Sequence, residues 1–331
     1  MTPSRRILLA EPLDFSPRAL AILQQAGEVE LRGCSSAGLA NAFQEYDVVW
    51  FRLASRITEA MLGANPRCQV LATPVTGIDH IDLCACEKRG IKVVSLRGEV
   101  EFLCNIRAAA ELTVAMAFAV MRRIPQAAKS VLSGKWNRDQ FRGNELFEKT
   151  AGIVGVGRLG SIVANYLHAF GMQVLGYDPQ ADFSHLPAEQ VVTLDELLQR
   201  SDLIFLLVSY GPTTRHLMGP RQFAAMRPGA FLVNTSRGGV VDEAALIDAL
   251  ATGHLAGAAL DVLEGEPDVT PAQPLVSFAQ SHDNLLITPH IGGNTWESFE
   301  KTEVFLARRV LAELQRLDKQ DMGIVSTQTV A

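Results

Sequence analysis

The chain has 331 residues, of which 48% are hydrophobic and 20% are charged, a composition typical of a globular protein long enough for two domains. Its formal net charge of −6 argues against nucleic acid or an anionic membrane surface as a main partner. No apolar run approaches the ~20 residues that a membrane-spanning helix needs, so we expect no membrane partner.

The first hundred residues alternate short apolar runs with helix-like segments. At the N-terminus an Arg pair precedes an apolar run that Glu11 and Pro12 interrupt, which indicates a first strand rather than a signal peptide. We expect strands at residues 7–10, 29–31, 48–51, 70–72 and 93–95, and helices at 17–26 and 58–63. This alternation predicts a parallel α/β sheet.

All the cysteines lie in the first third of the chain, at Cys34, Cys68, Cys84, Cys86 and Cys104. Their number is odd, and neither a CxxC pair nor a His partner occurs at metal-binding spacing. We therefore expect buried, reduced thiols, no metal site and a cytoplasmic location.

Residues 105–123 form an Ala-rich, almost entirely apolar segment that ends in two arginines and is followed by Pro125. Apolar residues all round a helix indicate burial on most sides. We predict a buried helix here, lying between domains or subunits.

Residues 150–178 have the pattern of a complete dinucleotide-binding unit. An apolar strand at 151–156 leads into Gly155, Gly157 and Gly160, a helix-period segment follows at 161–170, and a second apolar run at 172–177 ends on Asp178. The glycines permit a tight turn and close backbone approach, and the helix N-terminus favours a pyrophosphate. Asp178 lies 18 residues after Gly160 (178 − 160), where an acid binds the ribose hydroxyls and repels a 2′-phosphate. The pattern predicts NAD as the cofactor.

The βα rhythm continues to the end of the chain and predicts a second doubly wound sheet. Strands are expected at residues 203–208, 230–234, 256–260 and 285–288, and helices at 194–200, 243–252 and 295–317. The last helix would return the chain to the first domain, which makes that domain discontinuous.

Polar side chains follow three of these strands. Arg237 follows one, Asp261 with Glu264 and Glu266 follows the next, and His290 follows the last. Ligands bind outside the carboxyl ends of parallel strands, so these groups should converge. An Arg can grip a carboxylate and polarise its neighbouring carbonyl, a His can exchange the alkoxide proton, and an acid can orient that His. The set suits carbonyl reduction.

With these motifs the sequence resembles the NAD-dependent D-2-hydroxyacid dehydrogenases, on the phosphoglycerate dehydrogenase side. The resemblance covers about residues 48–317 and rests on GIVGVGRLG with Asp178, FLVNTSRGGVVDEAALIDAL, GAALDVLEGEP and NLLITPHIGG, together with NIRAAAE and GKWN. It implies two doubly wound parallel-sheet domains with the active site between them. A Rossmann NAD-binding domain (residues 102–289) would be inserted in a discontinuous flavodoxin-like substrate domain (residues 1–101 and 290–331).

The resemblance also implies roles for particular residues. The catalytic residues would be Arg237, Glu266 and His290, with Glu264 a solvated turn residue and Asp261 at the nicotinamide amide. The cofactor-binding residues would be Gly155, Gly157, Arg158, Leu159, Gly160, Asp178, Ser209, Thr214, Asn234, Thr235, Ser236, Asp261, Gly292 and Gly293. The substrate-binding residues would be Arg52, Val75, Thr76, Gly77, Asn105 and Arg138. Dimerisation would use residues 105–123 and the arm around Trp136, although Trp136 alone could also be a core aromatic.

The sequence departs from the family pattern in two places. Leu207 and Ser209 stand where a His and a Pro are usual, although Thr214 is kept. In the loop that faces a substrate phosphate, Arg52 is kept but its usual Ser neighbour is lost. Arg138 could reach such a phosphate from a partner subunit, so both phosphorylated and unphosphorylated substrates stay open.

We therefore expect an oxidoreductase that transfers hydride between NAD(H) and a small D-2-hydroxy acid/2-keto acid pair. A phosphoglycerate-like acid is the first candidate for the substrate, and hydroxypyruvate or glyoxylate is the unphosphorylated alternative. A formate or phosphite dehydrogenase of the same fold, or an NAD-responsive binding protein, is the remaining alternative.

Overall fold

A computed structural model describes residues 5–321 of the chain. The chain divides into two compact units, one made of residues 1–106 and 295–331 and the other of residues 107–294. We call them unit 1 and unit 2. The first is discontinuous and the second is inserted in it, with junctions after Ile106 and Asn294.

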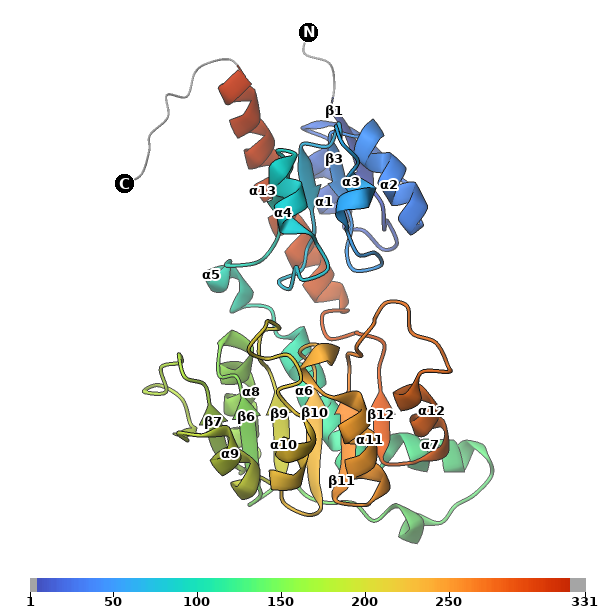
Figure 1. Ribbon diagram of the computed structural model, residues 1–331, viewed down its shortest axis with the longest axis vertical. Helices are drawn as coiled ribbons and strands as arrows, with labels where there is room; N and C mark the ends of the chain where they lie inside the picture. The colour runs from blue at the N-terminus through green and yellow to red at the C-terminus, as the bar shows by residue number, and fades with distance from the viewer. Residues whose placement is uncertain (1–4, 322–331) are drawn as a thin grey trace. The chain divides into compact units, whose positions relative to one another are not determined.

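Within the described residues, unit 1 contains a five-stranded parallel sheet in the order β2-β1-β3-β4-β5, the flavodoxin-like order (Figure 1). Its strands are β1 (Arg5–Leu9), β2 (Gly27–Leu31), β3 (Val48–Trp50), β4 (Val70–Ala72) and β5 (Lys92–Val94). Its helices are α1 (Pro17–Leu23), α2 (Ser36–Glu45), α3 (Glu59–Leu62), α4 (Leu83–Lys88), α5 (Val100–Leu103) and α13 (Trp296–Asp321).

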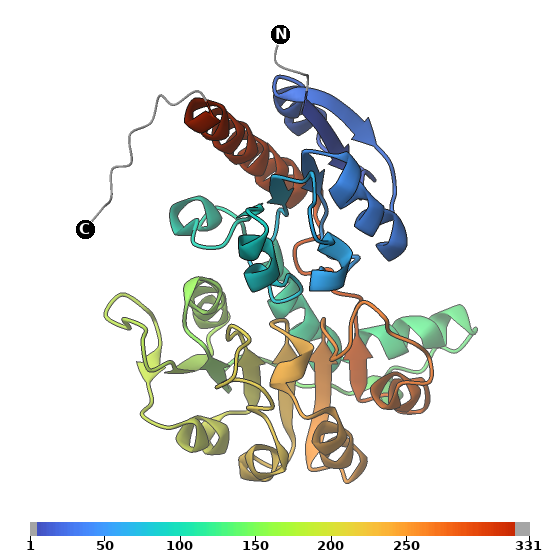
Figure 2. The same cartoon turned by 45° about the horizontal axis from the view of Figure 1, so that its top comes forward.

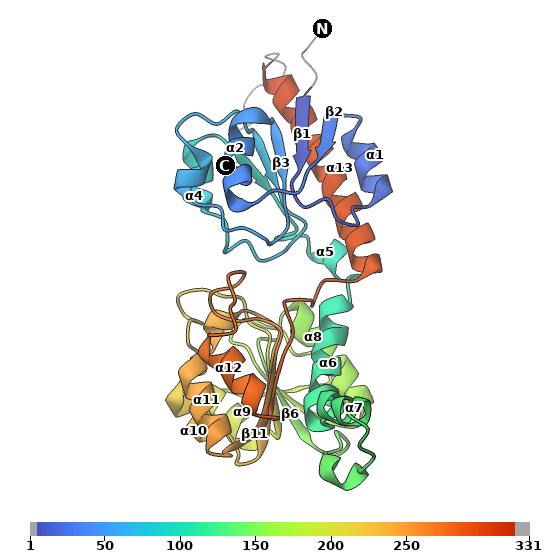
Figure 3. The same ribbon diagram turned by 90° about the vertical axis from the view of Figure 1, so that its right-hand side faces the viewer.

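Successive residues of β3 pack against helices on opposite faces of this sheet, as a doubly wound fold requires. Val49 packs in a cluster with α2, α3 and α4, whereas Val48 and Trp50 pack in a cluster with α1 and α13. Helix α13 lies along the unit 1 sheet beside α1, as Figure 3 shows. The terminal helix therefore completes the fold of the first hundred residues.

Unit 2 contains, in its described residues, a seven-stranded parallel sheet in the order β12-β11-β10-β9-β6-β7-β8 (Figures 1 and 2). Its strands are β6 (Thr150–Val154), β7 (Gln173–Tyr177), β8 (Glu189–Gln190), β9 (Leu203–Leu206), β10 (Ala230–Asn234), β11 (Leu255–Leu260) and β12 (Leu285–Ile287). Its α-helices are α6 (Ala108–Met121), α7 (Ile124–Leu132), α8 (Arg158–Ala169), α9 (Leu194–Arg200), α10 (Pro220–Ala225), α11 (Glu243–Ala251) and α12 (Pro274–Ser281), and two short 3₁₀ helices cover Arg138–Phe141 and Gly238–Val240.

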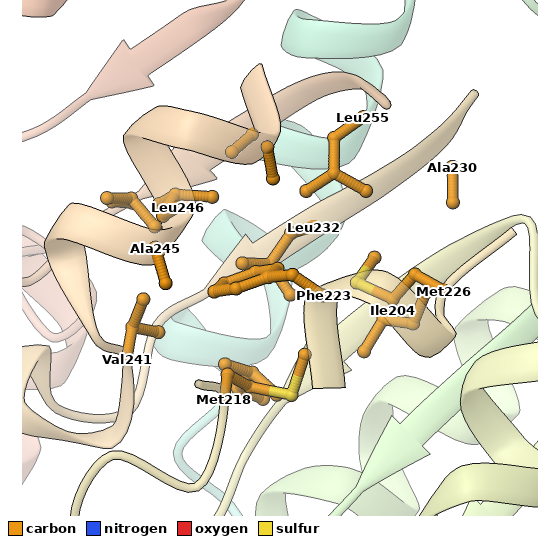
Figure 4. Close-up of a cluster of buried hydrophobic side chains, with 14 of the residues drawn as sticks. Ile204, Met218, Phe223, Met226, Ala230, Leu232, Val241, Ala245, Leu246 and Leu255 are labelled. Carbon is orange, nitrogen blue, oxygen red and sulfur yellow. The ribbon is translucent and has the colours of Figure 1, made fainter. Parts of the chain in front are cut away.

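The strand order of unit 2 reverses between β6 and β9, the point at which a Rossmann sheet binds its ligand. On one face α6 and α8 pack on the sheet, and on the other α9, α10, α11 and α12 do so. Figure 4 shows part of the second layer, where Phe223 of α10 lies next to Leu232 of β10 in a cluster that also contains Leu246 of α11.

Both predicted sheets are confirmed. The predicted buried helix at residues 105–123 is confirmed as α6, which begins at Ala108 and ends at Met121 and buries eight of its side chains. The predicted strand at 151–156 ends earlier, at Val154, because Gly155 has a φ of +91° and turns the chain into the loop.

The expectation that the cysteines are buried is wrong for part of the set. Cys68 and Cys86 are buried, and burial raises the pKa of their thiols to about 12 and about 11. Cys84 and Cys104 are exposed, and Cys34 is half-buried. All are free thiols. Cys84 and Cys86 lie on the short helix α4, which buries one side and exposes the other.

Within residues 5–321, no helix is long and apolar enough to cross a membrane. The same residues contain no group of three or more His, Cys, Asp or Glu side chains placed to hold a metal ion.

Candidate active site

The glycine loop follows β6 at the point where the sheet order reverses. A Cβ on Gly155 would lie 2.8 Å from the carbonyl carbon of Leu207, and a Cβ on Gly160 would lie 2.2 Å from the carbonyl oxygen of Gly155. Packing within unit 2 therefore requires glycine at both positions.

Gly157 is different, because nothing in the structure requires a glycine there. Its φ is −71°, which any residue adopts, and a Cβ would meet no described atom within 4 Å. The open space above Gly157 is what a ligand in contact with the backbone needs. It is the part of the structure that a dinucleotide would fill.

Helix α8 begins directly after Gly157, and among the described residues no side chain caps its N-terminus. The first helical hydrogen bond runs from Ser161 N to Gly157 O at 2.9 Å, so the amides of the first turn point out of the helix. Such an end attracts an anion such as a pyrophosphate. Arg158 and Leu159 occupy this turn, where the sequence predicted cofactor contacts.

Asp178 directly follows β7, and backbone amides fix its carboxylate beside the glycine loop. Val156 N donates to Oδ2 at 2.9 Å and Gln180 N donates to Oδ1 at 2.9 Å. A carboxylate held here accepts hydrogen bonds from ribose hydroxyls and repels a phosphate. The residues of this edge therefore fit a dinucleotide without a 2′-phosphate.

His290 and Glu266 form a hydrogen-bonded pair. The distance from His290 Nδ1 to Glu266 Oε1 is 2.9 Å, and each side chain is 26% exposed. The His290 backbone has a φ of +54° and its amide donates to the Asp261 carbonyl at 2.8 Å. With Nδ1 on the carboxylate, Nε2 is left to exchange a proton with a ligand.

Asp261 anchors the loop that carries His290. It is 1% exposed, its Oδ1 accepts from Thr288 Oγ1 at 2.6 Å and from Ile291 N at 2.8 Å, and its Oδ2 accepts from Gly292 N at 2.8 Å. These bonds tie the end of β11 to the loop after β12. Asp261 thus fixes the backbone that gives His290 its orientation, and Thr288 is a member of the site that the sequence analysis missed.

Arg237 lies on a strand end that neighbouring side chains hold rigidly. The Asn234 amide is fully buried, donates to the Arg237 carbonyl at 3.0 Å and accepts from Ser236 N and Oγ at 3.0 and 2.8 Å. Thr235 Oγ1 lies 2.7 Å from Thr113 Oγ1 of α6. The hydrogen bonds of Asn234, Thr235 and Ser236 therefore fix the backbone turn on which Arg237 lies.

The loops of Arg237 and Glu266 are packed directly on each other. A Cβ on Gly238 would lie 1.9 Å from the carbonyl carbon of Leu263, so only a glycine lets the two backbones approach. Strands β10, β11 and β12 are hydrogen-bonded neighbours, so Arg237, Glu266 and His290 all follow adjacent carboxyl ends. The three strands are therefore neighbours, as the sequence predicted, and the Glu266 and His290 side chains are in contact.

Glu264 is an exposed turn residue, as expected, and it also makes two contacts that the sequence did not predict. Its carboxylate lies 3.1 Å from His216 Nε2 and its amide donates to Glu243 Oε1 at 2.7 Å. Burial raises the pKa of Glu243, with the nearby Glu264 charge adding to that shift. Glu243 reads in the sequence as an ordinary helix-start acid, so only the fold reveals this contact.

The loop after β9 is closed by Thr214, whose Oγ1 donates to the Ser209 carbonyl at 2.8 Å and accepts from Gly211 N at 2.9 Å. Ser209 itself is exposed. On the loop after β12, Gly293 also has open space at its Cβ position.

The residues predicted to bind substrate fall in both units. In unit 1, Arg52 follows β3 and is paired with Glu303 of α13. The next strand, β4, is followed by Val75, Thr76 and Gly77. Thr76 is exposed, and the Val75 carbonyl accepts a hydrogen bond from Leu96 N. Asn105, also in unit 1, is exposed. In unit 2, the Arg138 side chain is 96% exposed. Trp136 is 89% exposed, so its alternative interpretation as a core aromatic is wrong.

An inserted dinucleotide-binding sheet with an Arg, a Glu–His pair and a glycine loop on one edge defines the class of a nucleotide-dependent oxidoreductase. Residues 114–292 match the NAD binding domain of the D-isomer specific 2-hydroxyacid dehydrogenases. The chain belongs to this family.

Named relatives agree with this assignment. D-3-phosphoglycerate dehydrogenase of Methanocaldococcus jannaschii is 36% identical over 92% of this chain and 56% of its own length. Hydroxypyruvate reductase of Thermotoga maritima is 34% identical over 93% of this chain and 98% of its own length. The crystal structure of D-lactate dehydrogenase from Aquifex aeolicus, complexed with NAD and lactic acid, has a TM-score of 0.81 and 29% identity over 97% of this chain and 100% of that one. The chain spans about half the length of the phosphoglycerate dehydrogenases that it matches.

Proposed function

We propose that the protein is an NAD-dependent oxidoreductase that interconverts a small D-2-hydroxy acid and its 2-keto acid. The observation that carries the proposal is the His290–Glu266 pair on the same sheet edge as Arg237 and the open glycine Gly157. The relatives and the solved structure named above act on acids of this kind, as their names state.

Each residue has a chemical task in this reaction. Arg237 binds the substrate carboxylate and polarises the adjacent carbonyl. His290 Nε2 gives a proton to the carbonyl oxygen during reduction and takes it back during oxidation, while Glu266 on Nδ1 holds the ring and stabilises its protonated form. NAD(H), when bound, supplies the hydride acceptor or donor.

The cofactor would be NAD rather than NADP. Its pyrophosphate would lie at Gly157 and the N-terminus of α8, and its adenosine ribose would lie at Asp178. The fixed Asp178 carboxylate favours hydroxyls over a phosphate at that ribose. In this arrangement unit 2 is the cofactor domain and the loops of unit 1 choose the substrate.

The protein would act as a homodimer in the cytoplasm. Helix α7 has no buried residue, and its neighbourhood exposes large apolar side chains, Leu132 at 90% and Trp136 at 89%. Exposed apolar surface of this kind is typical of an interface. Free thiols at Cys34, Cys84 and Cys104 support a reducing compartment.

The proposed function is tested by a His290→Asn variant assayed for NADH oxidation with 2-keto acids. We expect turnover to fall by about 10³-fold or more while the NADH dissociation constant stays within about twofold, because the imidazole acts on the proton and not on the cofactor. His168→Asn, an exposed histidine at the end of α8, is the matched control and should keep wild-type turnover. Equal turnover of the His290 variant and wild type would remove His290 from the mechanism. NADH binding without turnover in either protein would favour a binding protein.

A further inference from the structure

In unit 1 the loops that follow β1, β3, β4 and β5 form the carboxyl-end edge of a parallel sheet, the edge at which such sheets meet their ligands. Arg52 follows β3 on this edge, and the sequence left open whether it binds a substrate phosphate. Its surroundings therefore bear on the substrate class.

The Arg52 side chain is engaged within unit 1. Its Nη2 donates to Glu303 Oε1 at 2.6 Å, its Nη1 donates to the Leu13 carbonyl at 3.1 Å, and its guanidinium carbon lies 4.3 Å from the Phe299 ring centroid. The Arg52 side chain is 14% exposed and that of Glu303 is fully buried. Arg52 Nε is buried and has no hydrogen-bond partner among the described residues. The guanidinium thus faces α13.

Glu303 cannot follow Arg52 outward, because its second oxygen is fixed as well. Ser16 N, at the start of α1, donates to Glu303 Oε2 at 2.8 Å. Burial raises the pKa of Glu303, and the bonds from Ser16 and Arg52 oppose that shift. A phosphate that drew Arg52 away would leave a buried carboxylate without its counter-charge, which is strongly unfavourable.

A further carboxylate lies at the same loop. Glu11 Oε1 accepts from Arg52 N at 3.0 Å and from Ala54 N at 3.2 Å. The amides of Arg52 and Ala54, which could otherwise donate to a phosphate, are thereby occupied. The Arg52 charge and the amides of Arg52 and Ala54 are therefore engaged within unit 1.

We propose that Glu303 is a specificity-determining residue that withholds Arg52 from the substrate, so that the protein acts on small 2-keto acids without a phosphate group. This inference rests on the proposed function and deepens it. Arg32, Arg56 and Arg97 also follow strands on this edge, and all three are exposed. A preference of the wild-type protein for a phosphorylated substrate would mean that these arginines are sufficient for phosphate binding.

The test compares kcat/KM for hydroxypyruvate and for phosphohydroxypyruvate, with NADH, in wild type and in Glu303→Gln. The glutamine keeps the shape and an acceptor oxygen but removes the charge that neutralises Arg52. We expect wild type to prefer hydroxypyruvate, and the variant to raise the ratio of phosphorylated to unphosphorylated activity by about tenfold or more. Glu300→Gln is the matched control, because Glu300 lies one turn away on α13 and pairs with exposed Arg18 instead.

Each outcome decides the proposal. A wild-type preference for phosphohydroxypyruvate overturns it, even if Glu303→Gln fails to fold. An unchanged ratio in a folded Glu303→Gln variant, or the same rise in Glu300→Gln, also overturns it. If wild type binds NADH but turns over no 2-keto acid, the proposed function itself fails, and that result is distinct from a reversed preference.

Discussion

At the scale of single residues, the glycines of the loop after β6 separate into those that the fold requires and one that a ligand requires. Gly160→Ala should destabilise unit 2 by about 1–3 kcal/mol, because its Cβ would lie 2.2 Å from the Gly155 oxygen. Gly157→Ala should fold as stably as wild type but weaken NADH binding by about tenfold or more, because its methyl would enter space that is open without ligand. Urea unfolding measures the free energy of unfolding of both variants, and NADH fluorescence titration measures their dissociation constants for NADH. Tight NADH binding by Gly157→Ala would place the cofactor elsewhere.

Glu266 is predicted to act on His290 and not on the fold. Glu266→Gln should lower kcat by about 10²-fold, because a neutral amide stabilises the protonated ring poorly and can select the wrong tautomer. Glu264→Gln, two residues away and paired with His216, serves as control and should lose far less. Steady-state kinetics give the loss of kcat in each of the two variants. Comparable losses in both would mean that the loop as a whole, and not the Glu266 carboxylate, matters.

At the scale of elements, α10 is held to unit 2 by the apolar cluster of Figure 4. Phe223 is 2% exposed, so Phe223→Ala should cost about 3–5 kcal/mol of unfolding free energy. Phe170→Ala removes a ring that is 46% exposed and should cost clearly less. Denaturant titration gives both values, and equal losses would contradict the packing described.

The elements with a clear apolar pattern could be predicted from the sequence, including the three-residue strands β3, β4 and β5, whereas α2 and α7 were not among the expected helices. The buried strands and α6 follow from apolar runs and helical period, and the glycine loop follows from its spacing. By contrast, β8 has two residues and both are exposed, so no hydrophobic pattern marks it. Element ends were displaced where a turn such as Gly155 decides the boundary.

The site residues that follow strands could be predicted from the sequence. Those whose surroundings depend on pairing with a residue far away in the chain could not. Arg237, Glu266 and His290 could be selected because strand ends in a parallel sheet converge. The pairing of Arg52 with Glu303 joins residues 251 positions apart, and Glu303 reads in the sequence as one acid in a charged helix. Such contacts depend on tertiary packing, which local sequence does not encode.

At the scale of the whole molecule, the exposed apolar surface on and after α7 predicts association. Leu132→Glu combined with Trp136→Glu should convert a dimer into a monomer, because charges would replace the most exposed apolar side chains of this surface. Val192→Glu changes an equally exposed residue elsewhere in unit 2 and should leave the dimer intact. Sedimentation velocity measures the mass. A wild-type monomer, or a dimer that survives both charges, would refute this interface.

The central claim, NAD-dependent reduction of a 2-keto acid, is tested most directly by NADH oxidation with the purified protein. The panel should include phosphohydroxypyruvate, hydroxypyruvate, glyoxylate and pyruvate. The site predicts turnover with at least one of these acids, faster with NADH than with NADPH because of Asp178. Demonstrated NADH binding with no turnover of any of these acids would contradict the account.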